Sequence, residues 1–528
     1  MKELKGKQLS WAVWAAAGLA ISTFGFNQSA LGNLVRLPSF YEQFPQINSI
    51  TTVGAEKAHK STIEGTVVAL YTLFGAIGGL TCMLLGDVLG RKKTILVANV
   101  VQGIGYVLMS SSYAFAQLIV ARIVLGLGSG ALIATVSAWQ AELSRPRSRG
   151  AHVSAFGMFA GFGGAVGGWL EYGMQFYKTS SASWRVALAF PLVFTISLAV
   201  LMCFLPESPH WLIKKKREAE AKAILERVRA DWTDTELEDS VEQTVFNIQQ
   251  ASHVMNNRTV PLSSLFTMGD RRVFHRLCLA CGAQFFLQAN GTNAVVYYTT
   301  TIFQAELHFS LDLSYILAGC LAISITLAAF ICSFTVDRFG RRKLMLFGAA
   351  MCSVSMACLA GTASASTNKA ALKAAVFFVF SFKFFFTIGW LGIPFLYAAE
   401  VAPDDLRTPV CGIATAVGWL LNFLIAEVSP IAFTRIGNKY FIVFAVTNAV
   451  SALTIYFFYP ETNGCTLEEI DIIFTESKSV FDTVAVARRF PLDVDTRTSI
   501  ENGKIKPDME HVEFLGSAGE KTGTALPA

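Results

Sequence analysis

GDVLGRKK, at residues 86–93, returns as VDRFGRRK at residues 336–343, and this repeat decides the fold. Each copy follows a long apolar segment, the second of the chain in one case and the eighth in the other. Two more motifs recur at corresponding positions of the two halves. One is a Glu/Arg pair seven residues apart, Glu142 with Arg149 and then Glu400 with Arg407. The other is a Pro-Glu pair, within residues 206–209 and then within 460–463. Parallel repeats of this kind are typical of membrane proteins that hold a substrate between two homologous halves.

Twelve apolar segments fill most of the chain. Of its 528 residues, 53% are hydrophobic and 15% are charged, whereas a typical soluble domain has roughly 25% charged residues. A membrane-spanning helix needs about 20 mostly apolar residues, because hydrocarbon cannot satisfy an exposed backbone. The segments begin near Trp11, Ser61, Lys93, Ala116, His152, Trp184, Val273, Leu311, Leu344, Ala371, Thr408 and Lys439. The sequence therefore predicts an all-α polytopic membrane protein with 12 transmembrane helices in two six-helix bundles.

Charge divides the chain into membrane and aqueous parts. Basic clusters follow spans 2, 4 and 8, whereas the short turns after spans 3 and 7 carry no Lys or Arg. By the positive-inside rule, both termini face the cytoplasm. The predicted parts are a cytoplasmic N-terminus (1–10), an N-terminal six-helix bundle (11–205), a cytoplasmic helical insert (206–272), a C-terminal six-helix bundle (273–459) and a largely flexible cytoplasmic tail (460–528). In the insert, apolar residues at helical spacing predict amphipathic helices: Leu237, Val241, Val245 and Ile248.

The seventh span, QFFLQANGTNAVVYYTTTIF at 284–303, is rich in amides. Gln284 and Gln288 are four residues apart and share a helix face, and Asn290 and Asn293 follow. Gly291 leaves room for the helix to bend. A buried amide without a partner costs several kcal/mol in hydrocarbon, so we expect these side chains to line water or substrate. The alternative is that they hydrogen-bond neighbouring helices.

Carboxylates and arginines gather at the predicted cytoplasmic ends of the spans. Topology accounts for basic residues there, but it does not require carboxylates that recur in both halves. Charge-assisted bonds between helix ends would hold the cytoplasmic side shut and break when that side opens. The predicted network consists of Asp87, Arg91, Glu142, Arg149, Glu207, Asp337, Arg341, Glu400, Arg407 and Glu461.

Two cations lie well inside apolar spans, Arg122 in span 4 and Lys383 in span 10. Charges inside a membrane are costly and mark functional positions by default. For Lys383, three alternatives stay open: contact with substrate, contact with another helix, or an amine extended to the membrane surface.

The motifs GRKK, GRRK, PESPHWL, GTNAVVYY, EVAPDDLR and PETNGCTLEEID together carry a family resemblance. Over about residues 10–472 the chain resembles the sugar porter family of the major facilitator superfamily, and it is most similar to fungal members. The resemblance implies the major facilitator fold, alternating-access transport and the charge network described above. It also implies sugar binding by Gln288 and Asn293 and an extracellular gate formed by Tyr297 and Tyr298. The full set of expected substrate contacts is Asn27, Arg122, Gln284, Gln288, Asn290, Asn293, Phe395, Trp419 and Asn422.

The binding positions depart from the family pattern, although Asn422 is kept. Residues that usually carry an amide or a tryptophan are replaced at Gly157, Leu287, Ile325, Phe395 and Gly418. A site with fewer groups that bond hydroxyls discriminates less steeply among substrates. We therefore expect a larger, less polar pocket that takes a hexose, a polyol or a glycoside.

Span 1 carries Asn27, within GFNQ at 25–28, where proton-coupled members of the family carry an aspartate. An amide cannot titrate, although it can still bond substrate or Arg122. The simplest hypothesis is a facilitator that moves its substrate down a gradient. Coupling through another carboxylate stays open (Glu64, Glu171 or Glu427), as do export of a fungal secondary metabolite and nutrient sensing.

Other function classes lack a signal. The sequence has no GxxxxGK[ST] phosphate loop, and Cys278 and Cys281 form a CxxC without a second pair, so we expect no enzyme activity, no cofactor and no metal. The net charge of +5 is concentrated at span ends and predicts no nucleic-acid partner. The expected partners are a small-molecule substrate and the lipid bilayer, with the chain working as a monomer in the plasma membrane.

Overall fold

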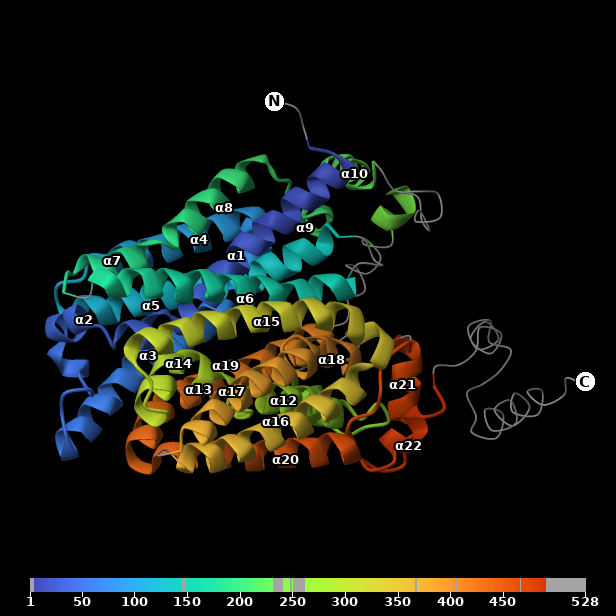
Figure 1. Cartoon of the computed structure of the whole chain (residues 1–528). Helices are drawn as coiled ribbons and strands as arrows, with labels where there is room; N and C mark the ends of the chain where they lie inside the picture. The colour runs from blue at the N-terminus through green and yellow to red at the C-terminus, as the bar shows by residue number, and fades with distance from the viewer. Residues whose placement is uncertain are drawn as a thin grey trace, which may run out of the picture.

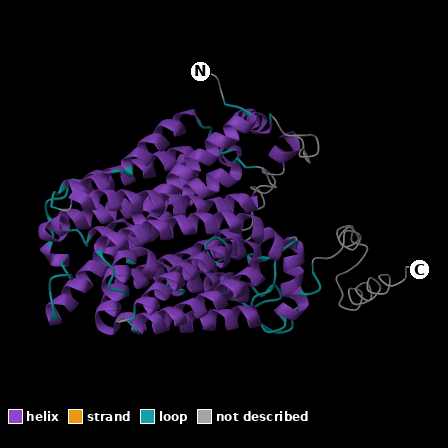
Figure 2. Cartoon of the chain, viewed as in Figure 1, coloured by secondary structure: helices purple, strands orange, loops and turns teal. Residues whose placement is uncertain are grey.

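The computed structural model describes residues 4–144, 149–177, 179–230, 241–246, 249, 262–365, 368–403, 406–465 and 467–490. These residues form helices and connecting loops, and no strand occurs among them (Figure 2). The apolar segments are helical because each backbone group must find its partner within its own segment when lipid surrounds it.

Each of the twelve predicted spans is present as a helix or as two consecutive helices. The first six are α1 (Gly6–Leu34), α3 (Gly54–Leu89), α4 (Arg91–Ser110), α5 (Phe115–Glu142), α6 (Arg149–Met174), and α7 (Ala182–Ala189) with α8 (Leu192–Phe204). The last six are α12 (Val273–Ala289) with α13 (Thr292–Tyr297), α15 (Leu311–Phe339), α16 (Arg341–Ser364), α17 (Lys369–Gly389) with α18 (Ile393–Val401), α19 (Arg407–Ile436) and α20 (Tyr440–Phe458).

By length and composition, nine stretches of the described chain can cross a membrane. One of them, Pro409–Phe458, covers α20 and all but the first two residues of α19. The 26-residue α6 and the 17-residue α12 with α13 supply the remaining two spans. The count of twelve therefore agrees with the hydropathy pattern.

The two halves lie against each other along two helix pairs, α6 with α15 and α3 with α19. Figure 1 shows most of the first half, coloured blue to green, above the second half, whose colours run from the yellow-green of α12 to red. Helices that face away from this boundary expose apolar side chains. On α4, Val97, Val100, Ile104 and Val107 are all at least half exposed and follow one helical stripe. Such a stripe suits contact with lipid tails.

Short helices cover the end of the bundle at which the GRKK and GRRK motifs lie; we call it the charged end, and the other the distal end. The insert forms α9 (Pro209–Lys214), α10 (Glu218–Arg229) and a helix over 241–246, with Val245 buried. Leu237 and Ile248, predicted for the same amphipathic helices, lie outside the described residues.

After the last span, the chain forms two helices that the sequence analysis did not separate from the tail. They are α21 (Leu467–Glu476) and α22 (Thr483–Ala487), which bury Ile473 and Val486. Asp471 of α21 is ion-paired with Arg276 of α12, which attaches this segment to the second half. Residues 491–528 lie outside the described part of the chain.

At the distal end, smaller elements connect the spans: α2 (Pro38–Gln43), and α14 (Thr299–Thr301) followed by a short π-helix over Ile302–Glu306.

Candidate functional site

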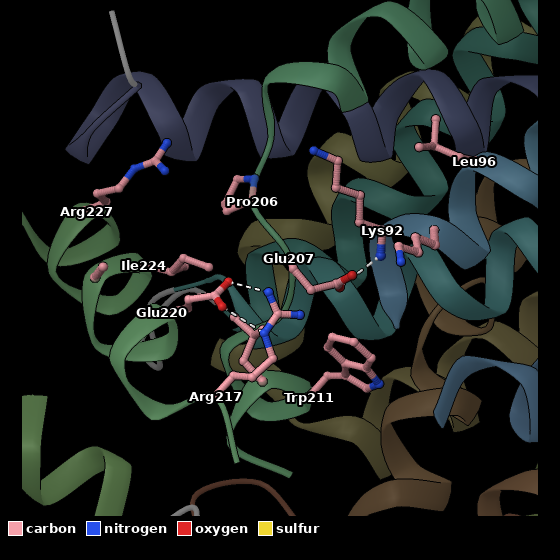
Figure 3. Close-up of a pocket in the computed structure, with 12 residues that line it drawn as sticks. Lys92, Leu96, Pro206, Glu207, Trp211, Arg217, Glu220, Ile224 and Arg227 are labelled. Atoms are coloured by element: carbon pink, nitrogen blue, oxygen red, sulfur yellow. Dashed lines mark hydrogen bonds and ion pairs between the residues drawn. The ribbon is translucent and has the colours of Figure 1, made fainter. Parts of the chain in front are cut away.

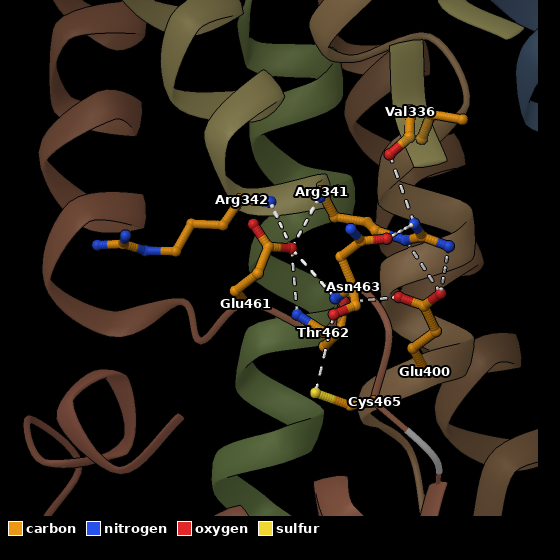
Figure 4. A network of polar contacts seen from close by, with 8 residues as sticks. All are labelled: Val336, Arg341, Arg342, Glu400, Glu461, Thr462, Asn463 and Cys465. Atoms are coloured by element: carbon orange, nitrogen blue, oxygen red, sulfur yellow. Dashed lines mark hydrogen bonds and ion pairs between the residues drawn. The ribbon is translucent and has the colours of Figure 1, made fainter. Parts of the chain in front are cut away.

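The second half carries a cluster of hydrogen bonds around an ion pair at the charged end (Figure 4). Arg341 begins α16 and donates from Nη2 to Oε1 of Glu400 at 3.0 Å, and from Nη1 to Oδ1 of Asn463 at 2.6 Å. The other Glu400 oxygen accepts from the Thr462 hydroxyl at 2.6 Å. Glu461 accepts from the backbone N–H of Arg341 at 2.8 Å and so caps the N-terminus of α16. The cluster ties together α16, α18 and the chain that follows α20.

The first half repeats this arrangement. Arg91 begins α4, and its Nη2 lies 3.3 Å from Oε1 of Glu142 at the end of α5. Glu142 accepts a hydrogen bond from the Ser208 hydroxyl, in the position that Thr462 takes in the second half. Glu207 accepts from the backbone N–H of Lys92 at 2.9 Å. The sequence repeat is therefore also a repeat of contacts.

Each ion pair among these described residues joins helices of a single half. The structure places six members of the predicted network in these two clusters: Arg91, Glu142, Glu207, Arg341, Glu400 and Glu461. Arg407 donates from Nε to the carbonyl of Ala399 at 3.1 Å. The side chains of Asp87, Arg149 and Asp337 lie outside the described part of the structure. Closure of one half against the other by these charges stays a prediction.

A cavity of about 620 Å³ lies beside the cluster of the first half (Figure 3). Lys92, Glu207 and Trp211 line it, and on its far side Arg217 donates from Nη2 to Oε2 of Glu220 at 2.6 Å. None of the expected substrate contacts is among its lining residues. This cavity therefore belongs to the charged end and is not the predicted substrate site.

At the distal end, the two halves are hydrogen-bonded to each other. Asn33, in the last turn of α1, accepts from the Thr300 hydroxyl at 2.9 Å, and its backbone carbonyl accepts from the Tyr315 hydroxyl at 2.9 Å. The Asn33 amide also donates to Oε2 of Glu171 in α6 at 2.8 Å. Within the described residues, the other hydrogen bonds between the halves join Arg36 to Thr301, Ser61 to Thr434 and Thr66 to Glu427. All of these bonds lie toward the distal end, which is closed in this structure.

The sequence analysis missed Asn33, although it lies in the same uncharged run as Asn27. A third amide near the end of span 1, after Asn27 and Gln28, was the available signal. Its partners come from α6, α14 and α15, and that combination cannot be derived from the sequence of one span.

The seventh span breaks in the middle of its amide cluster, where Gly291 has a φ of +96°. Gln288 ends one side of the break and Asn293 begins the other, and the Asn293 amide donates to the Gln288 carbonyl oxygen. Gln288 is half-buried, so this pair has access to the space between helices. Gln284 lies against α19, where a Cβ on Gly418 would be 3.0 Å from its Oε1. Asn290 is buried, and its side-chain amide has no hydrogen-bond partner among the described residues.

The two tyrosines of the predicted gate hold α13 against α19. The Tyr297 hydroxyl donates to Oδ1 of Asn422 at 2.9 Å, and the Tyr298 hydroxyl donates to the carbonyl of Ala426 at 3.0 Å. From the other half, α1 reaches α13 at Gly32, where a Cβ would lie 1.8 Å from the carbonyl oxygen of Tyr297. Glycine at this position therefore permits the distal end to close.

Aromatic side chains approach one another across the boundary between the halves. Trp419 of α19 meets Phe24 of α1 edge to face, with ring centroids 6.2 Å apart. Phe156 of α6 lies 6.1 Å from the same Phe24 ring. Phe395, on α18, is 43% exposed. Rings of this kind offer apolar faces to a substrate whose hydroxyls bond amides.

Asn27 and Arg122 do not bond each other. The Asn27 amide donates to the Tyr106 hydroxyl at 2.7 Å, inside the first half. Arg122 donates from Nε and Nη2 to the carbonyls of Val67 and Val68, at 3.1 and 2.7 Å. In this conformation Arg122 also lies over the Tyr71 ring, at 5.0 Å from its centroid. Contact of Asn27 or Arg122 with substrate stays a prediction.

Lys383 is buried inside the second half, with 3% of its surface exposed. Its amine donates to the Thr292 hydroxyl at the start of α13. In this conformation Lys383 therefore contacts another helix, and its contact with substrate stays an open prediction.

Twelve helical spans in two six-helix halves, with ion pairs repeated at one end and a broken, amide-bearing helix between, define a membrane transporter of the major facilitator type. Comparisons agree: the family model described as "Sugar (and other) transporter" matches residues 11–474. The chain belongs to this family of transporters.

Several similar proteins are fungal transporters. The chain is 33% identical to the sugar transporter STL1 of Saccharomyces cerevisiae, over 90% of this chain and 83% of the relative. It is 32% identical to the MFS-type transporter oryC of Aspergillus oryzae, over 98% of both chains.

A solved structure of the proton:xylose symporter XylE from Escherichia coli superposes on this chain with a TM-score of 0.72. It is 21% identical, and the match covers 88% of this chain and 99% of that one. This likeness confirms the major facilitator fold.

Proposed function

We propose that the protein transports a sugar or sugar-like molecule, such as a hexose, a polyol or a glycoside, by alternating access. The observation that carries this proposal is the Gln288–Asn293 amide pair, placed across the break of the seventh span. An amide both donates and accepts, and so does each hydroxyl of a polyhydroxylated substrate. Relatives named as sugar transporter and low-affinity glucose transporter support this class of substrate.

The proposed binding surface lies between the broken span and the facing helices of both halves. Gln284, Gln288 and Asn293 supply amides from α12 and α13, and Trp419 supplies an aromatic face. Asn422, Phe395 and Phe24 complete the wall. Asn290 and Lys383 are buried behind this surface, and Asn27 and Arg122 act within the first half.

The cycle alternates between distal and charged ends. In the structure the distal end is closed by Asn33 and by the approach of Gly32 to Tyr297. For the opposite state, the charge network closes its own end while the distal contacts open. Partly exposed ion pairs are worth on the order of 1 kcal/mol each, so both states can have similar free energies.

Transport is facilitated and not coupled to protons. The contact that supports this part of the proposal is Asn27 with Tyr106, because neither side chain releases a proton near neutral pH. Arg122 is matched to backbone carbonyls and needs no carboxylate. The chain works as a monomer in the plasma membrane, with the charged end and both termini in the cytoplasm.

Proteoliposomes test the proposal directly. The purified protein is reconstituted, and uptake of labelled glucose, xylose, glycerol and an alkyl glucoside is followed with and without an imposed pH gradient. We expect saturable equilibration of at least one compound, with no accumulation above the outside concentration. Failure of every compound would overturn the substrate class, and binding without uptake would favour a sensor.

The alternative to facilitation is transport coupled to protons, and one carboxylate is a specific candidate for the coupling group. Glu171 is fully buried, and within the described residues its hydrogen bond comes from Asn33, at the contact between the halves. Accumulation that collapses with a protonophore would overturn facilitation. Loss of that accumulation in Glu171→Gln would assign the coupling to this carboxyl group, and its persistence would exclude Glu171.

A further inference from the structure

The break between α12 and α13 is supported from behind by α20. Because the helix is interrupted at Gly291, the carbonyls of Ala289 and Asn290 need partners outside their own helix. Thr447 donates to the first at 2.9 Å, and Asn448 donates to the second at 3.0 Å. The Phe444 ring of α20 also packs directly against Gly291, where a Cβ would be 2.4 Å from its Cγ. The break is therefore a built feature with its own set of contacts.

A third contact to the broken span comes from α17, and its donor is a buried amine. Lys383 donates from Nζ to the Thr292 hydroxyl, on the first residue of α13. Its Nζ also lies 4.9 Å from the centroid of the Phe386 ring, one turn further along α17. Within the described residues, no carboxylate forms an ion pair with Lys383. A buried amine with a hydroxyl partner is expensive compared with an apolar side chain of the same length.

This cost points to a role in transport. We propose that Lys383 is a positioning residue that holds α13, through Thr292, in the orientation that closes the distal end. The inference deepens the proposed transport function and rests on it. An amine–hydroxyl bond holds α13 without the strength of an ion pair, so it can break and re-form in each cycle.

The orientation of α13 matters because residues of this short helix form contacts on both of its sides. Asn293, one residue after Thr292, bonds Gln288 across the break. Tyr297, at the end of the same short helix, bonds Asn422, and its carbonyl meets Gly32 of the other half. A tilt of α13 at Thr292 therefore changes the amide pair and the closed distal contact together.

The distal end can be observed directly through Ser61, which bonds Thr434 across the halves and is 1% exposed. Ser61→Cys introduces a thiol of similar size that becomes accessible when this end opens. The rate of its modification by a membrane-impermeant maleimide, applied in proteoliposomes, reports the open population. The same protein without Ser61→Cys corrects for the ten native cysteines.

Four variants are compared in this background: Lys383→Met, Lys383→Arg, Thr292→Val and the control Lys373→Met, which removes an exposed lysine from the same helix. For Lys383→Met we expect labelling to rise about fivefold and substrate exchange to fall about tenfold, because the equilibrium shifts toward the distal-open state. Equilibrium substrate binding should change less than about threefold, since no contact to substrate is removed. Lys383→Arg should restore part of both rates, and Lys373→Met should match the wild type.

Thr292→Val removes the hydroxyl alone and keeps the inference testable if Lys383→Met does not fold. It should reproduce the labelling increase, and the double variant should add nothing to it, because both changes remove one bond. Unchanged labelling in Thr292→Val, or effects of the two changes that multiply, would overturn the inference. Labelling needs no substrate, so a wild type that transports none of the compounds would refute the proposed function and leave this test intact.

Discussion

The amide of Asn27 lies 2.7 Å from the Tyr106 hydroxyl and donates its hydrogen bond there. Gln102, one turn before Tyr106 on α4, donates to the same hydroxyl at 3.2 Å and to Thr23 of α1 at 3.1 Å. These groups form a neutral polar network between α1 and α4. A network without a titratable acid or base gives this contact between α1 and α4 no dependence on pH in the physiological range.

Asn27→Asp should therefore make transport depend on pH. A carboxyl group of the same shape still meets the Tyr106 hydroxyl but can now take up and release a proton. Initial rates of the variant should vary several-fold between about pH 5 and pH 8, the range in which a perturbed carboxyl group titrates. The measurement is zero-trans uptake into proteoliposomes at a series of symmetric pH values.

The wild type is the control for this experiment, and its rates should be flat over the same range. Tyr106→Phe adds a second control, because it removes the hydroxyl without adding a charge and should lower stability by about 1 kcal/mol. A wild-type pH profile as steep as that of the variant would place the titrating group elsewhere, with Glu171 the first to examine.

Gly32→Val should prevent closure of the distal end. A Cβ at this position would lie 1.8 Å from the Tyr297 carbonyl oxygen, so α1 and α13 would be forced apart. We expect substrate exchange to fall about tenfold or more, because the cycle cannot pass through the distal-closed state. Gly173→Val is the matched control, since a Cβ there meets no atom within 4 Å. Equal losses in both variants would mean that branched side chains in these helices, and not closure, limit transport.

The spans and their repeat could be predicted because they depend on local properties. Hydropathy locates a helix in a membrane whatever its neighbours are, and GDVLGRKK with VDRFGRRK marks equivalent positions in each half. The contacts of Arg91 with Glu142 and of Arg341 with Glu400 follow from the same repeat, since each pair occupies the same two helix ends.

The partners of single polar residues could not be predicted in the same way. The partner of Asn27 depends on how α1 is rotated about its axis against α4 and α5. That rotation decides whether the amide faces Tyr106 or Arg122. The role of Asn33 depends on which helices of the second half reach α1 when the distal end closes. For Lys383, hydropathy identified the cost of burial but not the helix that satisfies the amine.

Arg341→Gln should destabilise the second half. The Arg341 and Glu400 side chains are 11% and 18% exposed, so removal of the guanidinium leaves a partly buried carboxylate without its cation. We expect a loss of about 1–3 kcal/mol in the free energy of unfolding, seen as a lower thermal midpoint in detergent. Arg338→Gln removes an exposed arginine from the last turn of the preceding helix, α15, and should leave the midpoint unchanged. Equal thermal midpoints in the two variants would mean that the cluster stabilises the protein no more than an exposed arginine does.

The amide pair at the break of the seventh span should determine the KM for substrate. Gln288→Ala and Asn293→Ala should each raise KM about tenfold, because each removes a group that exchanges its present bond for one to a substrate hydroxyl. Asn290→Ala provides the comparison within the same turn. Its amide is buried with no hydrogen-bond partner among the described residues, so its loss should leave KM unchanged and stability equal or higher. The three variants thus separate amides that face substrate from one that faces the interior. A rise in KM for Asn290→Ala alone would show that the broken span turns the other face to the substrate.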